Sequence, residues 1–275
     1  MPVRLLHLSD IHFGSENRAA LAAATDFVHA TPFDLLVLSG DITQAGDDAE
    51  FAAARAWLSG LPGPHLSTPG NHDTPWMGLI ARVVRPFEAY ARSIGPSARA
   101  GFEGPGLHAQ ALNSARGWQL RLNWSKGEVS RRQAEAAADA LAASSRDSLR
   151  VVVCHHPLVE AVGEPMTARV RGGKSAARRL CGADVDIVLS GHLHAPFVEA
   201  LPFGDGRSYA VGAGTLSLRE RGVPPGFNVI DVDGDEMAVS GMAWEAGRLA
   251  VRDHWVVPLR SRATEGAGQV NGAAA

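Results

Sequence analysis

The sequence predicts an α/β fold in which helices cover a strand-rich core and an antiparallel meander follows toward the C-terminus. Short apolar runs alternate with Ala-rich helical stretches up to about residue 197, and strands separated by helices indicate a sheet that is covered on both faces. Beyond that point the apolar runs follow one another across Gly/Asp turns, which is typical of antiparallel strands. A length of 275 residues fits one large domain better than two small ones.

Each expected element has its own signal in the sequence. The first strands are short apolar runs, expected at residues 3–8, 34–38, 65–67, 151–154 and 187–189. The helices are longer Ala-rich or amphipathic stretches, expected at residues 18–30, 49–58, 131–143 and 175–180. The meander is expected to form a second sheet from residues 208–211, 227–232, 237–244 and 249–257. We expect residues 1–262 to form a single domain and the Gly/Ala-rich residues 263–275 to be a disordered tail.

Composition and charge argue against several classes of protein. The net charge is −3, and lysine occurs only at Lys126 and Lys174. This argues against nucleic acid as a partner, because proteins that bind polyanions show a strongly basic face. There is no run of eighteen apolar residues, so we expect no membrane span. The first residues lack the charged start and apolar stretch of a signal peptide, and we therefore expect a cytoplasmic protein.

Polar side chains gather directly after the apolar strands. They are Asp10 and His12, Asp41, Asn71 and His72, His155 and His156, and His192 and His194. The carboxyl ends of the strands in an open α/β sheet form the rim at which ligands bind. Segments far apart in the sequence therefore deliver Asp, Asn and His side chains to one rim.

These residue types suit a transition-metal centre. Oxygen and imidazole ligands without thiolate suit Mn, Fe, Zn, Co or Ni rather than a sulfur-bound structural zinc. Seven ligands are too many for one open catalytic ion but fit two ions that share a carboxylate. Two ions about 3.5–4 Å apart clamp both the attacking and the leaving oxygen of a phosphoryl displacement. A water between them has its pKa lowered to about 7, which gives a hydroxide nucleophile.

Five motifs in order between residues 5 and 196 together resemble the calcineurin-like metallophosphoesterases. They are Asp10-x-His12, Gly40-Asp41, Gly70-Asn71-His72-Asp73, His155 in Cys-His-His-Pro, and Gly191-His192-x-His194. The flanking Gly40-Asp41-Ile42-Thr43 with Gly46, and Ala111-Leu112-Asn113-Ser114, are similar to the class III branch of cyclic-nucleotide and glycerophosphodiester phosphodiesterases. The resemblance implies an αββα fold, a two-sheet sandwich flanked by helices.

The resemblance also implies an activity and the residues that carry it. The enzyme would use a metal-bound hydroxide to hydrolyse a small phosphodiester, either a cyclic nucleotide or a glycerophosphodiester. Two divalent or trivalent ions (Mn, Fe or Zn) would be bound, one by Asp10, His12, Asp41 and His194, the other by Asp41, Asn71, His155 and His192. His72 would contact the phosphate and protonate the leaving oxygen, and Asp73 would orient His72.

Residues 76–94 have two interpretations. Trp76, Leu79, Ile80, Val83, Val84 and Phe87 follow helical spacing, with an interruption before Pro86. The segment either packs on the core or forms an apolar lip that receives a hydrophobic substrate or makes peripheral contact with a membrane. The second interpretation fits an alternative function, the hydrolysis of a lipid-linked phosphodiester or pyrophosphate of the UDP-diacylglucosamine type. Family members with that activity usually have Gly-Asn-Arg-Asp at the third motif, whereas this chain has His72, which favours the small diester.

Some further assignments stay open at this point. Only one imidazole of the Cys-His-His-Pro segment need face the metals, so His156 is expected to have a structural role. Arg169, Arg171 and Lys174 either neutralise a second phosphate or are solvated loop charges. A scaffold that has lost catalysis would have lost ligands, whereas every ligand position is filled. A homodimer is among the states that the sequence allows.

Overall fold

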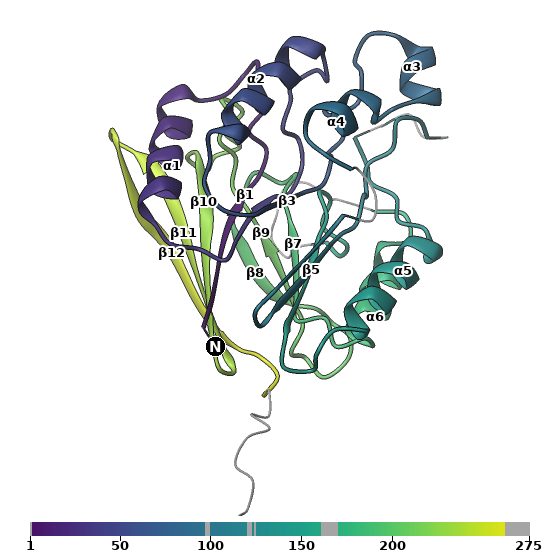
Figure 1. Cartoon of the computed structure of the whole chain (residues 1–275), viewed down its shortest axis with the longest axis vertical. Helices are drawn as coiled ribbons and strands as arrows, with labels where there is room; N and C mark the ends of the chain where they lie inside the picture. Colours follow the sequence, from purple (N-terminus) through teal and green to yellow (C-terminus); the bar gives the residue numbers. More distant parts are fainter. Residues whose placement is uncertain (1, 97–99, 120–122, 124, 161–169, 262–275) are drawn as a thin grey trace, which may run out of the picture.

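Two six-stranded sheets lie between helices in the computed structural model (Figure 1). The structure describes residues 2–96, 100–119, 123, 125–160 and 170–261, so the expected tail at residues 263–275 lies outside it. None of the helices in the described part of the chain combines the length and the apolar composition of a membrane span. The expected two-sheet sandwich flanked by helices is confirmed.

The first sheet has the strand order β12-β11-β10-β1-β2-β3. Its strands are β1 (Val3–Leu8), β2 (Leu35–Leu38), β3 (His65–Ser67), β10 (Gly226–Asp233), β11 (Glu236–Glu245) and β12 (Arg248–Pro258). β1, β2 and β3 pair in parallel, and β10 pairs with β1 in the antiparallel direction. The meander β10–β12 therefore extends the sheet that the N-terminal strands begin, and the expectation that it forms a separate sheet is wrong.

The second sheet comes from the middle of the chain, in the order β4-β5-β6-β7-β9-β8. Its strands are β4 (Gly101–Gly104), β5 (Leu107–Ala111), β6 (Leu149–Val153), β7 (Ile187–Ser190), β8 (Phe197–Ala200) and β9 (Tyr209–Gly212). β5, β6, β7 and β9 are parallel. The segment expected at residues 208–211 is thus not part of the meander: it forms β9, parallel to β7.

The helices follow the sequence expectations closely, and their first turns show why they begin where they do. They are α1 (Arg18–Ala30), α2 (Asp48–Ser59), α3 (Leu79–Val84), α4 (Glu88–Ser93), α5 (Arg131–Ala142) and α6 (Gly173–Cys181). Asn17 and Asp47 accept backbone N–H groups at the starts of α1 and α2, and Ser130 and Gln133 form a capping box on α5. Such caps stabilise a helix by about 1 kcal/mol each. The helical segment is interrupted between α3 and α4, where Pro86 cannot continue the helix.

Three apolar layers hold the sheets and helices together. Strand side chains alternate between the two faces of a sheet, so Leu5 of β1 packs between the sheets with Val151 of β6. Its neighbour Leu6 faces outward, against α1 and α2. Ala138 of α5 and the neighbouring α6 cover the outer face of the second sheet. Each fully buried leucine contributes about 1.5–3 kcal/mol, and together these layers fix the strand ends that carry the polar clusters.

Candidate metal centre and active site

The polar clusters of both sheets meet at one edge of the sandwich. Asp10 follows β1 and Asp41 follows β2 in the first sheet, whereas His155 follows β6 and His194 follows β7 in the second. Asp10 Oδ1 lies 3.1 Å from His194 Nε2, and Asp41 Oδ2 lies 3.3 Å from His155 Nε2. Each of these pairs joins one sheet to the other, so the centre exists only when the two sheets pack together.

Several residues of the centre have strained backbone conformations. Five non-glycine residues of the centre have positive φ values between 48° and 70°: Asp10, His12, Asp41, His192 and His194. Such conformations cost about 1–3 kcal/mol each and concentrate at functional sites. Two neighbouring glycines leave room for the carboxylates: a Cβ at Gly70 would overlap Asp41 Oδ1, and one at Gly191 would overlap Ser9 Oγ and Asp10 Oδ2.

The donor atoms form overlapping groups that fit metal ions. Atoms within 4.8 Å of one another come from four sets of residues, namely Asp10/His12/His194, Asp10/Asp41/His155, His12/Asp41/His72 and His155/His156/His192. Five side-chain atoms of the expected metal ligands are buried without a hydrogen-bond partner: Asp10 Oδ1, Asn71 Oδ1, both ring nitrogens of His12, and His155 Nε2. Buried polar atoms are nearly always paired, and a cation would satisfy these oxygens and nitrogens together. The donor set therefore fits metal ions.

Backbone carbonyls fix the orientation of two imidazoles. His155 Nδ1 donates to the carbonyl of Ser39 at 2.8 Å, and His194 Nδ1 donates to the carbonyl of Arg219 at 2.8 Å. A carbonyl can only accept, so the proton of each neutral ring is assigned to Nδ1 and the lone pair to Nε2. This is the usual arrangement around metal-binding histidines, in which the second ring nitrogen is held by an outer partner.

Electrostatics of the centre couple carboxylates and imidazoles. Although burial opposes ionisation, the imidazoles of His194 and His12 hold the pKa of Asp10 well below its usual range. Burial lowers the pKa of His155, but the carboxylates of Asp41 and Asp10 outweigh it and raise that pKa to about 9. Burial, together with the nearby His155, lowers the pKa of His192 to about 3. Without metal, the imidazole of His155 is therefore protonated at neutral pH.

His72 lies beside the donor cluster, but its partner differs from the expected one. Its Nδ1 donates to the carbonyl of Gln44 at 2.6 Å. The carboxylate of Asp73 instead accepts the backbone N–H groups of Ile42, Thr43 and Gly70 and the hydroxyl of Thr43. The expectation that Asp73 orients the ring of His72 is therefore wrong: Asp73 clamps the loops that carry Asp41 and Asn71, and a backbone carbonyl orients the ring.

The profile of one protein family matches residues 3–196, most of the chain. It describes the calcineurin-like phosphoesterases. The chain belongs to the calcineurin-like phosphoesterase family. As a member of it, the protein is a metal-dependent phosphoester hydrolase, and its His/Asp groups are candidate sites for divalent metal ions.

Two curated relatives in this family carry the names of phosphodiesterases. A probable cyclic nucleotide phosphodiesterase of Synechococcus sp. is 23% identical over 265 residues, which cover 89% of this chain and 93% of that protein. A glycerophosphodiester phosphodiesterase of Enterobacter lignolyticus is 36% identical over 81 residues, which cover 25% of this chain and 29% of that protein.

Solved structures share the calcineurin-like phosphoesterase fold with this chain. A purple acid phosphatase from yellow lupin (Lupinus luteus) seeds has a TM-score of 0.65 at 13% identity. The match covers 94% of this chain and 54% of that chain, so the lupin chain is considerably longer. A protein of Thermus thermophilus has a TM-score of 0.54 at 14% identity; that match covers 94% of this chain and 100% of the Thermus chain. At these identities, both similarities concern the fold alone.

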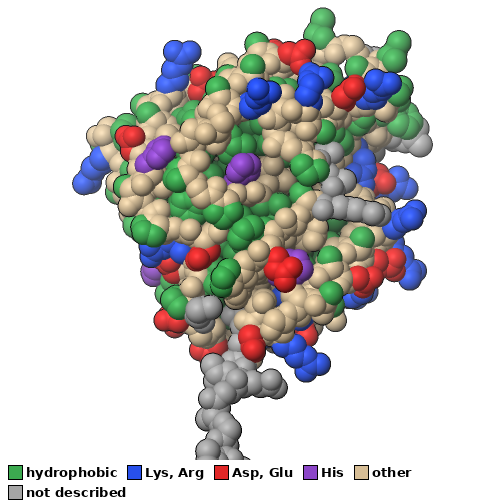
Figure 2. Space-filling model, viewed as in Figure 1, with side chains coloured by type: hydrophobic (Ala, Val, Ile, Leu, Met, Phe, Trp, Pro, Cys, Tyr) green, Lys and Arg blue, Asp and Glu red, His purple; other side chains and the backbone are tan. Residues whose placement is uncertain are grey.

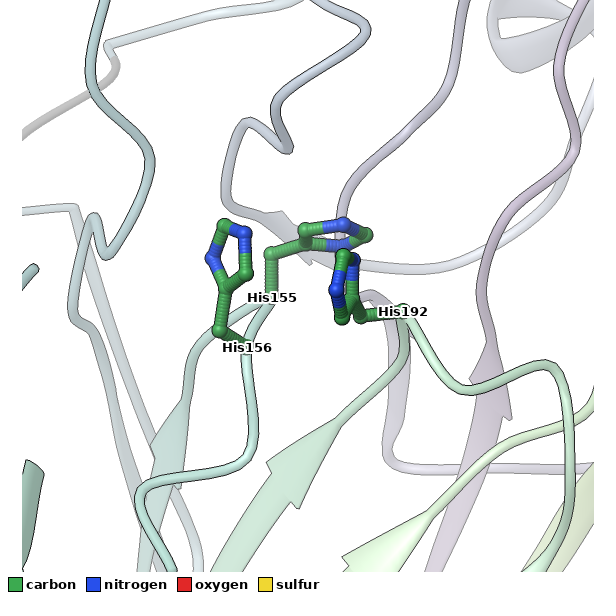
Figure 3. Close-up of side chains that lie close together, drawn as sticks. All are labelled: His155, His156 and His192. Carbon is green, nitrogen blue, oxygen red and sulfur yellow. The ribbon is translucent and has the colours of Figure 1, made fainter. Parts of the chain in front are cut away.

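In this phosphoesterase, His156 makes hydrogen bonds through both ring nitrogens. Figure 3 shows its ring beside those of His155 and His192. Its Nε2 donates to the carbonyl of Ser125 at 2.8 Å, and its Nδ1 is 2.9 Å from the hydroxyl of Ser114. Both ring nitrogens of His156 therefore have protein partners, whereas His155 Nε2 is buried without one. The geometry agrees with a structural role, in which His156 fixes the segment around Ser114 and Ser125 to the loop that carries His155.

Two arginines of this phosphoesterase site were missed by the sequence reasoning. Arg219 Nη1 lies 2.8 Å from His72 Nε2, and Arg221 Nη1 donates to the carbonyl of His192 at 2.9 Å. They follow β9, whose carboxyl end lies on the same side of the second sheet as that of β7. If residues 208–211 had been assigned to the parallel sheet, the loop after β9 would have been expected at the rim with the other site residues. Assigning these residues to the meander hid that signal.

The basic residues that follow the His155 loop were expected either to bind a second phosphate or to be solvated charges. Arg171 Nη1 lies 3.9 Å from Glu128 Oε2, and its side chain is mostly exposed. Lys174 is exposed on α6. Arg169 lies outside the described residues. Arg171 and Lys174 therefore agree better with solvated charges than with a second phosphate site.

Proposed function

We propose that this phosphoesterase is a dinuclear phosphodiesterase that hydrolyses a small phosphodiester, either a cyclic nucleotide or a glycerophosphodiester. The observation that carries the proposal is the position of Asp41 between two groups of donors. Its Oδ2 lies 3.3 Å from His155 Nε2 on one side and 3.9 Å from His12 Nε2 on the other. One carboxylate between two sets of imidazoles is what two ions sharing a ligand require.

The donors divide into two sets around this carboxylate. We assign Asp10, His12, Asp41 and His194 to one ion and Asp41, Asn71, His155 and His192 to the other. When bound, such ions would neutralise phosphate charge and supply an activated water as the nucleophile. Each set contains a buried oxygen without a hydrogen-bond partner, Asp10 Oδ1 in the first and Asn71 Oδ1 in the second, and a bound ion would pair with it.

His72 is the proposed general acid. Its ring centroid lies 4.8 Å from that of His12, so it borders the donor cluster. The bond from Nδ1 to the carbonyl of Gln44 leaves Nε2 as the atom that exchanges a proton with substrate. In its protonated form Nε2–H would donate to the leaving oxygen as the bond between that oxygen and phosphorus breaks, and His72 would end the step neutral.

The preference for a small diester rests on the relatives and on surface charge. The relative matched along most of this chain is named as a cyclic nucleotide phosphodiesterase, and the second is named as a glycerophosphodiester phosphodiesterase. On the face seen in Figure 2, acidic and basic side chains are interspersed. A net charge of −3 likewise argues against nucleic acid as substrate.

A lipid-linked phosphodiester or pyrophosphate is the second candidate, favoured by the apolar surface around α3. Met77 is 82% exposed and Ile80 is 80% exposed, and Trp76 and Val84 are also exposed. The upper right of Figure 2, where Figure 1 labels α3, is rich in hydrophobic side chains. Of the two interpretations of residues 76–94, packing on the core fits Tyr90 of α4 but not these exposed side chains in and before α3.

A substrate screen tests the proposal. The manganese-reconstituted protein would be assayed with bis-p-nitrophenyl phosphate, p-nitrophenyl phosphate, cyclic AMP, glycerophosphocholine and a UDP-linked lipid precursor. We expect higher kcat/KM for the soluble diesters than for the monoester. A preference for the monoester would contradict the diesterase proposal. A preference for the lipid precursor that is lost in Ile80→Asp would favour the second candidate.

A further inference from the structure

We propose that Arg219 is a phosphate-binding residue of this site, and that its guanidinium pairs with His72 when no phosphate is bound. The assignment of the anion as the substrate or product phosphate rests on the proposed function. The ligand class is a tetrahedral phosphate oxyanion with at least two free oxygens, as in a phosphodiester or a phosphate monoester.

The contact between Arg219 and His72 shows where such an anion would bind. Because Nδ1 of His72 donates to the carbonyl of Gln44, the neutral ring presents a lone pair at Nε2. Arg219 Nη1 lies 2.8 Å from that atom and donates to it. An arginine N–H and the proposed acid atom thus meet at one point beside His12 and Asp41, where a phosphate with its leaving oxygen near His72 would lie.

The backbone of Arg219 is held by a chain of buried hydrogen bonds that begins at Asp10. The hydroxyl of Thr215 donates to the carbonyl of Asp10 at 2.7 Å, and the hydroxyls of Thr215 and Ser217 are 2.7 Å apart. Arg219 N–H donates to the hydroxyl of Ser217 at 3.2 Å, and the carbonyl of Arg219 accepts from His194. Thr215 and Ser217 are fully buried. The backbone position of Arg219 is therefore tied to two proposed metal ligands, independently of its side chain.

The guanidinium has the right chemistry for the ligand. It is permanently charged, and its planar N–H donors match two oxygens of a phosphate. His72 is a neutral partner that offers one acceptor atom, whereas a phosphate carries negative charge and offers two oxygens to the planar guanidinium, which allows a bidentate pair. An arriving phosphate would therefore compete successfully with His72 for Arg219 and leave Nε2 free to face the leaving oxygen. Arg221, bonded to the carbonyl of His192, adds a second positive charge along this side of the centre.

Equilibrium binding of inorganic phosphate to the manganese-loaded protein tests the assignment without turnover. We expect Arg219→Gln to weaken phosphate binding by about tenfold to a hundredfold, the value of a hydrogen bond to a charged group. Metal content should not change, because the carbonyl that holds His194 stays in place. Arg219→Lys should recover part of the affinity, since it keeps the charge but not the two-pronged geometry. In assays with bis-p-nitrophenyl phosphate, KM should rise by a similar factor.

The matched control is Arg252→Gln. Arg252 is an arginine of β12 that pairs with Glu245 at the edge of the first sheet, and its replacement should leave phosphate binding unchanged. Wild-type affinity for phosphate in Arg219→Gln would overturn the assignment, as would no phosphate binding by the wild type. Loss of metal in Arg219→Gln would also overturn it and make the side chain a structural support. A wild type that binds phosphate through Arg219 but hydrolyses no phosphoester would contradict the proposed function alone.

Discussion

Asp41 Oδ2 lies 3.3 Å from His155 Nε2, so a carboxylate at the end of β2 in one sheet contacts an imidazole at the end of β6 in the other. The other oxygen of Asp41 accepts the backbone N–H of His72 at 2.7 Å. One side chain thereby touches both sheets and the loop that carries the proposed acid.

The first prediction concerns metal content. Purified protein should carry close to two transition-metal ions per chain, and Asp41→Ala should lose both because its carboxylate is shared. Elemental analysis after gel filtration measures both values. Asp231→Ala, which removes a half-exposed carboxylate paired with Arg4, is the control and should keep both ions. An active enzyme with one ion or none would rule out the dinuclear proposal.

The second prediction separates metal binding from acid catalysis. His72→Ala should keep both ions, because Asn71 supplies the ligand of that loop, while turnover of a diester with an alkoxide leaving group falls roughly 10²–10⁴-fold. The loss should be much smaller with bis-p-nitrophenyl phosphate, since p-nitrophenolate leaves without a proton. Steady-state kinetics on the paired substrates give the comparison. His254→Ala, at an exposed histidine of β12, should behave as wild type. An equal loss on both substrates would mean that His72 mainly positions the phosphate.

The third prediction concerns pH. The pKa of His155 in the metal-free site is raised to about 9, so this imidazole is protonated at neutral pH and must lose its proton before it binds a metal. Metal affinity should therefore rise with pH up to about 9, and metal binding at pH 7 should release a proton. His192, whose pKa is lowered to about 3, is already neutral at pH 7 and contributes no such release.

Calorimetric titration with manganese in buffers of different ionisation enthalpy measures this proton directly. His155→Gln should abolish the release from this position. Activity should fall in acid and recover partly with added metal, because protons compete for the imidazoles. Metal binding at pH 7 without proton release, or full activity near pH 5 with both ions retained, would contradict the prediction.

The fourth prediction concerns Asp73, which accepts hydrogen bonds from three backbone N–H groups and one hydroxyl while fully buried. Asp73→Asn keeps the size but turns an NH₂ group toward backbone N–H groups that now donate to the carboxylate. Each unsatisfied buried donor costs about 1–3 kcal/mol, so we expect the free energy of unfolding to fall by at least about 2 kcal/mol.

Urea denaturation followed by circular dichroism gives that value. Asp26→Asn, on the exposed face of α1, is the control and should change stability by less than about 0.5 kcal/mol. If Asp73→Asn were as stable as wild type but lost turnover, Asp73 would act in the reaction itself rather than as a clamp between loops.

Local signals determined much of the fold. The helix at residues 18–30 was predicted with the bounds of α1, because its apolar spacing and the cap at Asn17 are both local. Val151–Val153 of β6 and Ile187–Leu189 of β7 are buried on both faces, so they stand out as unbroken apolar runs. β4, β5 and β8 were not predicted, because they are short and their sequences lack a strong strand signal. Pairing with neighbouring strands of the second sheet stabilises them. The place of β9 was mistaken because strand direction depends on the pairing partner.

The sequence by itself determined which residues gather at the site, because each follows a strand and the carboxyl ends of parallel strands share a rim. It thereby predicted the proposed metal ligands from Asp10 to His194 and the neighbouring His72. Only the tertiary structure decided what each side chain touches. Asp73 accepts hydrogen bonds from backbone N–H groups, and the carbonyl of Gln44 orients the ring of His72. Arg219, in the loop after β9, contacts His72. Hydrogen-bond partners are set by distances of about 3 Å between segments remote in sequence, and those distances arise only when the two sheets pack together.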